Sequence, residues 1–323
     1  MPKRDLTRLL IETTVSRILQ DMERDGPRSC RKLLDLALRF CPGPFESHLL
    51  TLCRDALDLE TSRYPQLVSR MLQDVNRDYL IHLSVNLGYE AGRLGAQRIR
   101  QVKAREGLNV PWAMVLDMAC GSVCRSILQQ AMELGCRVYL IRDCGLDWQE
   151  LEQLLQSSPN AFFAVLASAE HALAWNLPRL AAWQNLLMVV PQEAEALCRC
   201  LEAQRMPYAV SLRYQDSSVL HQLESLPPRK SLAAFLIDGG APETVRQAVY
   251  AHVLECRKAG KYPFVPVELQ EDILAISRMV SGRPLGLHFA PSGAVQPYGS
   301  PAASSWNIRQ QPLRQILAQA YAR

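Results

Sequence analysis

Hydrophobic residues recur at helical spacing through the first third of the chain. The first stripe consists of Leu6, Leu9, Leu10, Thr13, Val15, Ile18 and Leu19. A second stripe, over residues 33–40, follows a predicted break at Asp25-Gly26-Pro27, and Cys41-Pro42-Gly43-Pro44 predicts a helix stop. Further helices are predicted over about 45–59, 64–74 and 76–103. Residues 1–105 are therefore predicted to form an all-α region.

From residue 110 onward the pattern changes to short apolar runs that alternate with helical stretches. The runs cover residues 113–117, 137–141, 162–166, 186–190, 208–212 and 233–237. Near-continuous apolar strands alternating with helices indicate a parallel sheet that is buried on both faces. Six βα units favour a partial (β/α) barrel, and an open doubly wound sheet is the structural alternative.

The alternation is expected to end near Lys261-Tyr262-Pro263. The segment Leu285 to Gln296 carries a Ser-Gly turn between two short apolar runs and predicts a β-hairpin. A last helix is predicted over about 312–321. The predicted organisation is thus a helical region over 1–105, a (β/α) region over 106–260 and a C-terminal hairpin segment over 261–323.

Composition narrows the class of protein only slightly. Of the 323 residues, 48% are hydrophobic and 21% are charged, and this hydrophobic content is enough to form a core. The net charge of +4 argues against a nucleic-acid partner. No apolar run approaches the roughly 18 residues needed to span a bilayer, and the start of the chain lacks the pattern of a signal peptide. We therefore expect a cytoplasmic protein without a membrane span. In such a protein the ten cysteines are expected to be buried thiols or ligands.

Three short blocks of the chain resemble a known family. Val110-Pro-Trp-Ala-Met-Val-Leu-Asp117 is similar to the first barrel strand of radical S-adenosylmethionine (SAM) proteins with a SPASM-type C-terminal segment. Leu287-His-Phe-Ala-Pro-Ser-Gly-Ala-Val-Gln-Pro297 and Asn307-Ile-Arg309 resemble the C-terminal hairpin and the ending of that family. The resemblance implies a partial (β/α) barrel of the radical SAM type, preceded by the all-α region and followed by the hairpin segment.

The chemistry of that family depends on residues that this chain lacks. The family's first strand leads into Cys-x3-Cys-x2-Cys, whose thiolates hold an iron–sulfur cluster that binds SAM. Here Cys120 and Cys124 have the first spacing, but Ile127 stands at the third position. The helix predicted over Ser126 to Gly135 leaves almost no room for a cluster loop before the second strand.

Other motifs of the family are replaced as well. The second strand ends in Arg142-Asp143-Cys144-Gly145-Leu146 instead of Gly-Gly-Glu-Pro, which binds the SAM amine in the family. Tyr298 follows Pro297 where the family has a cysteine, and no cysteine lies near Arg278. We therefore expect no cofactor. An iron–sulfur cluster and SAM are expected only if Cys120 and Cys124 are a remnant metal site completed by a partner.

Polar residues at the predicted strand ends are weak candidates for a ligand site. Asp117, Arg142, Asp143, Arg213 and Asp238 would share the C-terminal face of the barrel, where sites of such folds are built. The structural alternative is that they form ordinary loop ion pairs. The six histidines show no metal-binding or catalytic spacing, and His288 is expected to face one side of the hairpin.

These observations lead to three alternative functions. The first is a non-catalytic relative of the radical SAM family, acting as a structural, regulatory or substrate-binding partner of an active homologue. The second is an enzyme or ligand-binding protein of another chemistry that uses the vacated barrel mouth. The third is a radical SAM enzyme whose cluster is completed by a partner.

Overall fold

A computed structural model describes residues 6–40, 44–117, 121–142, 145, 147–227, 230–298 and 305–321. The chain divides into two compact units, and each combines an early and a late part of the sequence. The first unit consists of Met1–Val85 and Val189–Leu269, and the second of Asn86–Met188 and Gln270–Arg323. The boundaries predicted near residues 105 and 260 divide the sequence differently and stay predictions.

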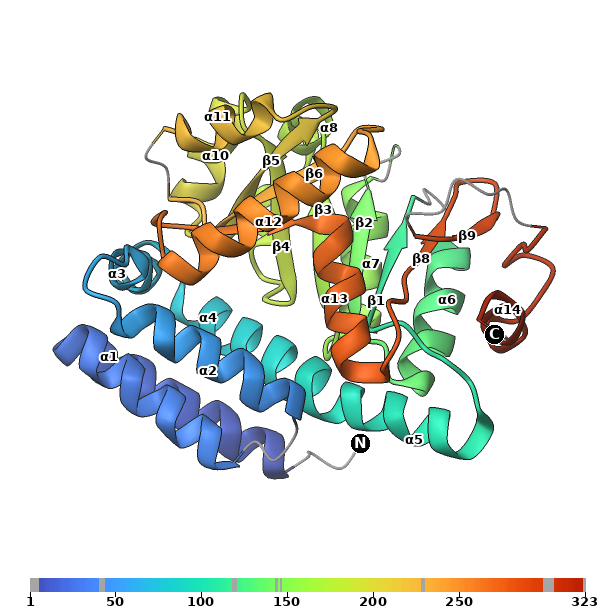
Figure 1. The fold of residues 1–323 in the computed structure, drawn as a ribbon, viewed down its shortest axis with the longest axis horizontal. Coiled ribbons are helices and arrows are strands. Elements are labelled where there is room, and N and C mark those ends of the chain that lie inside the picture. Colours follow the sequence, from blue (N-terminus) through green and yellow to red (C-terminus); the bar gives the residue numbers. More distant parts are fainter. Residues whose placement is uncertain are drawn as a thin grey trace. The chain divides into compact units, whose positions relative to one another are not determined.

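The first unit begins with the predicted helical region. Its helices are α1 (Leu6–Phe40), α2 (Pro44–Asp58), α3 (Tyr64–Asp74) and α4 (Arg77–Ser84). The break predicted at Asp25-Gly26-Pro27 is wrong, because these residues lie inside α1, a single helix of 35 residues. A proline inside a helix removes one backbone hydrogen bond. The packing of α1 against α2, α3 and α4 offsets this cost (Figure 1).

The rest of the first unit alternates strands and helices. It contains α10 (Glu195–Ala203), β5 (Tyr208–Tyr214), α11 (Ser218–Glu224), β6 (Ala233–Asp238), α12 (Glu243–Ala259) and β7 (Val265–Glu268). β6 pairs in parallel with β5 on one side and β7 on the other. The expected end of the alternation near residue 261 is wrong, since β7 and the following helix α13 (Leu269–Ser281) continue it.

The second unit starts with a helix of unusual geometry. Residues predicted as one helix divide into α4, a π-helical stretch η1 (Val85–Gly95) and α5 (Ala96–Glu106). Two polar residues of η1 are buried: Asn86 donates to the carbonyl oxygens of Pro159 and Ala161, and Glu90 lies 3.4 Å from Arg137. These contacts tie η1 to the starts of β2 and β3.

Parallel strands again form the sheet of the second unit. Its early elements are β1 (Ala113–Leu116), α6 (Gly121–Leu134), β2 (Val138–Arg142), α7 (Trp148–Ser157), β3 (Phe162–Leu166), α8 (Ala169–Ala174) and α9 (Leu177–Leu180). β4 (Leu186–Pro191) has its first three residues in this unit and its last three in the other. β1 pairs in parallel with β2 on one side and with β8 (Leu287–Phe289) on the other.

The predicted C-terminal hairpin is confirmed. β8 pairs antiparallel with β9 (Val295–Pro297), and α14 (Leu313–Ala320) follows. Gly293 turns the chain with φ of +87°, and a Cβ atom there would lie 2.6 Å from the Asn307 side chain. The hairpin therefore requires glycine at this position, since a larger residue would be both strained and obstructed.

The expected alternation of parallel strands and helices is confirmed and is consistent with a partial β/α barrel. Within each unit the consecutive βα strands are also neighbours, in the orders β1-β2-β3 and β5-β6-β7. A doubly wound sheet reverses its strand order at a switch point, and neither series shows such a reversal. Among the described residues, no helix has the length and apolar character needed to cross a membrane.

Candidate functional site

Three polar side chains meet at neighbouring strand ends in the second unit. Arg142 is the last residue of β2, Asp117 directly follows β1, and His288 lies in β8. β1 stands between β2 and β8, and the Asp117 amide donates to the Phe289 carbonyl oxygen at 2.8 Å. The strand register thus brings together side chains from distant parts of the sequence. We call these three residues the mouth cluster.

Asp117 is the centre of the mouth cluster. The Nε and Nη2 atoms of Arg142 donate to its two carboxylate oxygens, and Nε2 of His288 lies 2.7 Å from Oδ2. Nη2 of Arg142 also lies 3.0 Å from Nε2 of His288. A two-pronged arginine–carboxylate pair is among the stronger ionic contacts in proteins and fixes the orientation of both groups.

The mouth cluster holds Asp117 in its ionised form. Partial burial acts to raise the pKa of Asp117, but hydrogen bonds from His288 and Arg142, together with their charges, outweigh burial and lower it. Exposed fractions of 13% for Asp117, 19% for His288 and 31% for Arg142 show that solvent still reaches the cluster. It is therefore a partly open ionic site at the C-terminal edge of the strands.

The other predicted site residues are Asp143, Arg213 and Asp238. Arg213 and Asp238 belong to the first unit, at the ends of β5 and β6, and Asp143 lies outside the described residues. Asp238 accepts hydrogen bonds from the amides of Gly240 and Ala241 and thereby shapes the turn that leads into α12. Asp238 thus has a structural role in this turn.

A second group of ionisable residues lies at strand ends of the first unit. The Tyr214 hydroxyl, at the end of β5, donates to Glu268 at the end of β7 over 2.8 Å, and Glu268 is fully buried. Burial and the nearby carboxylates of Glu268 and Asp238 raise the Tyr214 pKa. Arg246 of α12 pairs with Asp238 and Glu243. Because both Tyr214 and Glu268 are inaccessible, this group serves to join β5 to β7.

Cys124, the one of the two remnant cysteines that lies within the described residues, is not placed to hold an iron–sulfur cluster. Cys124 lies inside α6 and is completely buried, on the same helix face as Ile127, Leu128 and Ala131. This face belongs to the hydrophobic core, and Cys124 is buried within it. Cys120 lies outside the described residues. Within the described part of the chain, no three His, Cys, Asp or Glu side chains are grouped to hold a metal ion.

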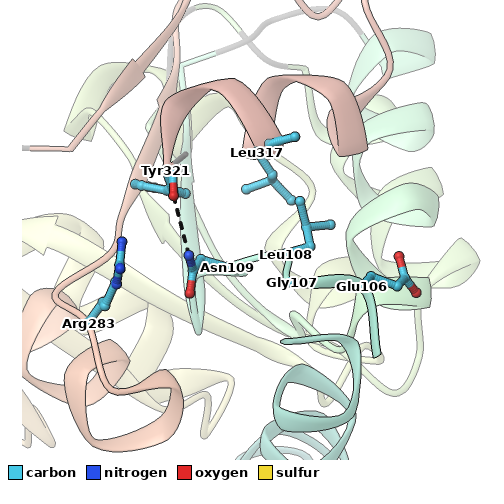
Figure 2. A pocket seen from close by; sticks show the side chains of 8 residues that line it. Glu106, Gly107, Leu108, Asn109, Arg283, Leu317 and Tyr321 are labelled. Carbon is cyan, nitrogen blue, oxygen red and sulfur yellow. Dashed lines mark hydrogen bonds between the residues drawn. The ribbon is translucent and has the colours of Figure 1, made fainter. Parts of the chain in front are cut away.

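A pocket of about 250 Å³ lies in the second unit, near the chain's C-terminal helix (Figure 2). Its lining residues are Glu106, Gly107, Leu108, Asn109, Arg283, Leu317, Ala318 and Tyr321. Asn109 donates to the Tyr321 carbonyl oxygen at 3.3 Å, and Glu106 pairs with Arg314. Asn109 precedes β1, so the pocket lies towards the N-terminal ends of the strands, the edge that contributes stability in barrel folds.

Sequence reasoning missed His288 as a member of the site. It placed His288 on a hairpin strand but gave no sign that β8 pairs with β1. The parallel pairing of β1 with β8 brings the imidazole beside Asp117. A histidine on the first strand of the predicted C-terminal hairpin was the available signal, although its partner could not be identified from spacing.

The comparisons with known proteins give no family assignment for the chain. No protein-family model matches it, and no curated protein matches it significantly.

Proposed function

We propose that this chain is a non-catalytic protein related to the radical SAM and SPASM family. Its role would be that of a structural, regulatory or substrate-binding partner of an active homologue. The observation that supports this proposal most directly is the connection after β1. Only three residues separate Asp117 from α6, which begins at Gly121.

The short connection conflicts with what a cluster would require. A cluster loop must present three thiolates on one side of the barrel mouth. Here the second cysteine of the motif, Cys124, is already inside a helix and fully buried, and its third position is the buried Ile127. Exposing Cys124 would require α6 to leave the sheet, so the donor set does not fit a cluster.

The residue at the end of β2 in the mouth cluster also supports the proposal. Arg142 stands at the end of β2, where the family carries a glycine-rich turn with an acidic residue for the SAM amine. Its guanidinium is held by Asp117. An arginine side chain only donates hydrogen bonds, so it cannot accept one from the SAM amine as the acidic residue of the family does.

Anaerobic reconstitution with iron and sulfide tests the cluster part of the proposal. We expect the wild-type chain and a Cys120→Ala/Cys124→Ala variant to retain the same small amount of iron, with no absorption from a four-iron cluster. A four-iron cluster in the wild type that is absent from the double variant would overturn the proposal. A chain that forms a cluster only with an added homologue would favour the third alternative, in which two proteins share it.

Co-expression with an intact radical SAM protein from the same genome tests the partner role. We expect a stable complex in size-exclusion chromatography that forms equally well with the Cys120→Ala/Cys124→Ala variant, because the thiols have no part in it. Separate elution of the two proteins across a range of concentrations and homologues would contradict a partner role.

A further inference from the structure

The pocket beside the C-terminal helix contains a buried polar atom without a partner. Asn109 lines this pocket and is only 8% exposed. Its Nδ2 donates to the Tyr321 carbonyl oxygen, but its Oδ1 is enclosed and accepts no hydrogen bond from the described residues. Buried acceptors without a partner destabilise a fold, and native structures contain few of them. The Oδ1 atom therefore points to a hydrogen-bond donor that the described residues do not supply.

Arg283 brings a positive charge to the same pocket. It lies between α13 and β8, it is exposed, and its side chain has no hydrogen bond or ion pair with the described residues. Arg283 and Glu106 lie on opposite sides of Asn109 in Figure 2, and Glu106 is paired with Arg314. A planar guanidinium binds a carboxylate through two parallel hydrogen bonds. Arg283 is thus placed to receive an anionic group of a ligand.

The size and the apolar wall of the pocket limit what it can hold. Leu108, Leu317 and Ala318 contribute apolar surface, and the two leucines lie between Asn109 and Glu106 in Figure 2. The volume of about 250 Å³ is below the range of about 300–1,000 Å³ that is usual for larger ligands. The pocket therefore fits a molecule of the size of an amino acid with an aliphatic side chain.

We propose that this pocket binds a small aliphatic acid with an amino or hydroxyl group on the carbon next to its carboxylate. The carboxylate pairs with Arg283, the adjacent N–H or O–H donates to Oδ1 of Asn109, and the aliphatic part packs against Leu108 and Leu317. The Nδ2 contact of Asn109 is long at 3.3 Å and the amide torsion of asparagine is soft, so a small rotation brings Oδ1 into the pocket. This goes beyond the proposed partner function and is independent of it, because the mouth cluster lies at the other ends of the strands.

Isothermal titration calorimetry of the full chain with four compounds of one carbon skeleton tests the proposal. L-leucine and 2-hydroxy-4-methylpentanoate carry both groups, 4-methylpentanoate lacks the donor, and L-leucinamide lacks the carboxylate. We expect at least one of the first two to bind saturably with a dissociation constant of about 1 mM or lower, and the last two to bind at least about tenfold more weakly. The tighter of the first two shows whether the ligand carries an amine or a hydroxyl.

Arg283→Gln tests the contact with the carboxylate. The side chain is exposed, so we expect the variant to fold with unchanged circular dichroism and to bind the tighter acid at least about tenfold more weakly. Arg105→Gln is the matched control, since Arg105 is exposed next to the lining residue Glu106 but does not itself line the pocket. It changes the net charge equally, and we expect it to alter the affinity by less than about twofold.

Asn109→Ala tests the contact with the donor through a ratio of affinities. In the wild type we expect the tighter acid to be preferred over 4-methylpentanoate at least about tenfold, and in Asn109→Ala we expect this preference to disappear. Both affinities are measured on one folded sample, so a moderate loss of stability does not affect the ratio. If the variant does not fold, the four compounds and Arg283→Gln decide the outcome.

Four results would overturn the proposal. These are the absence of saturable binding by either acid up to tens of millimolar, equally tight binding of a compound that lacks one of the two groups, unchanged binding by Arg283→Gln, and an unchanged ratio in a folded Asn109→Ala. Neither iron–sulfur reconstitution nor complex formation enters this experiment. Failure here therefore leaves the proposed partner function standing, and the reverse also holds.

Discussion

At the scale of single residues, sequence position predicted two members of the mouth cluster but not the third. Asp117 and Arg142 were predictable because both end buried strands, and parallel strands present their carboxyl ends at one edge. His288 was not predictable, because the pairing of β8 with β1 places it beside Asp117. In the sequence His288 lies 146 residues from Arg142, the other member of the cluster. The same limit applied to Glu268, whose buried hydrogen bond with Tyr214 depends on β7.

Asp117→Asn should reveal how much the mouth cluster stabilises the second unit. The amide removes the charge that holds Arg142 and His288, so we expect the free energy of unfolding to fall by about 1–3 kcal/mol at pH 7. Because the pKa of Asp117 is lowered in the folded state, its contribution is present above the ordinary aspartate pKa and is lost as pH falls through the lowered value. The difference from wild type should therefore shrink in urea titrations as the pH falls below the ordinary aspartate pKa and through the lowered value.

Asp58→Asn is the control for this change. Asp58 pairs with Arg31 at 2.7 Å, but both side chains are 48% exposed. An exposed ion pair contributes about 0–1 kcal/mol. A larger loss of stability from Asp58→Asn than from Asp117→Asn would contradict the role given to the mouth cluster.

At the scale of elements, periodicity predicted helices and strands more reliably than it predicted their limits. Buried runs such as Phe162–Leu166 were recognisable because a parallel strand is apolar on both faces. β7 escaped notice because it is short, contains Pro266 and ends in Glu268, all unusual for a buried strand. The continuity of α1 through Pro27 was not predicted, because Gly26 and Pro27 favour a helix break locally. Packing between helices outweighs that local preference.

Gly135→Ala should be far more damaging than its place at a helix end suggests. Gly135 has φ of +105°, and a Cβ atom there would lie 2.7 Å from the Gly95 carbonyl oxygen and 2.9 Å from the Ile99 amide. We expect a loss of about 2–5 kcal/mol, since backbone strain and the displacement of α5 from α6 add together. Thermal or urea unfolding monitored by circular dichroism measures it.

Gly107→Ala provides a matched control at another helix end. Gly107 ends α5 with φ of +67°, but nothing lies within 4 Å of the added Cβ position. Only the backbone strain remains, so the expected loss is about 1–2 kcal/mol. Equal losses at the two glycines would show that the approach of α5 to α6 is unimportant.

At the scale of the whole molecule, the sequence predicted the class of fold but not the composition of its units. The alternation of strands and helices followed from local patterns. The division into two units, each built from an early and a late segment, did not. Contacts between segments so far apart in the sequence leave no periodic signal. The same reason explains why the parallel pairing of β8 with β1 was not expected.

Thiol labelling of the native chain should follow the burial of individual cysteines. Cys198 and Cys200 lie two residues apart in α10, yet Cys198 is 2% exposed and Cys200 is exposed. We expect an alkylating reagent to modify Cys200 rapidly, and to modify Cys198, Cys124 and Cys136 only after denaturation. Burial raises the pKa of Cys136 to about 12, which slows its reaction further. Peptide mapping by mass spectrometry would contradict the fold if Cys124 reacted as fast as Cys200.

The parallel pairing of β1 with β8 has a consequence for how the protein folds during its synthesis on the ribosome. β1 is synthesised long before β8, the strand that covers its free edge. Until then the edge of β1 exposes unpaired backbone groups, which favour association with other chains. The mouth cluster can therefore form only after β8 has been synthesised, long after Asp117 and Arg142 have left the ribosome.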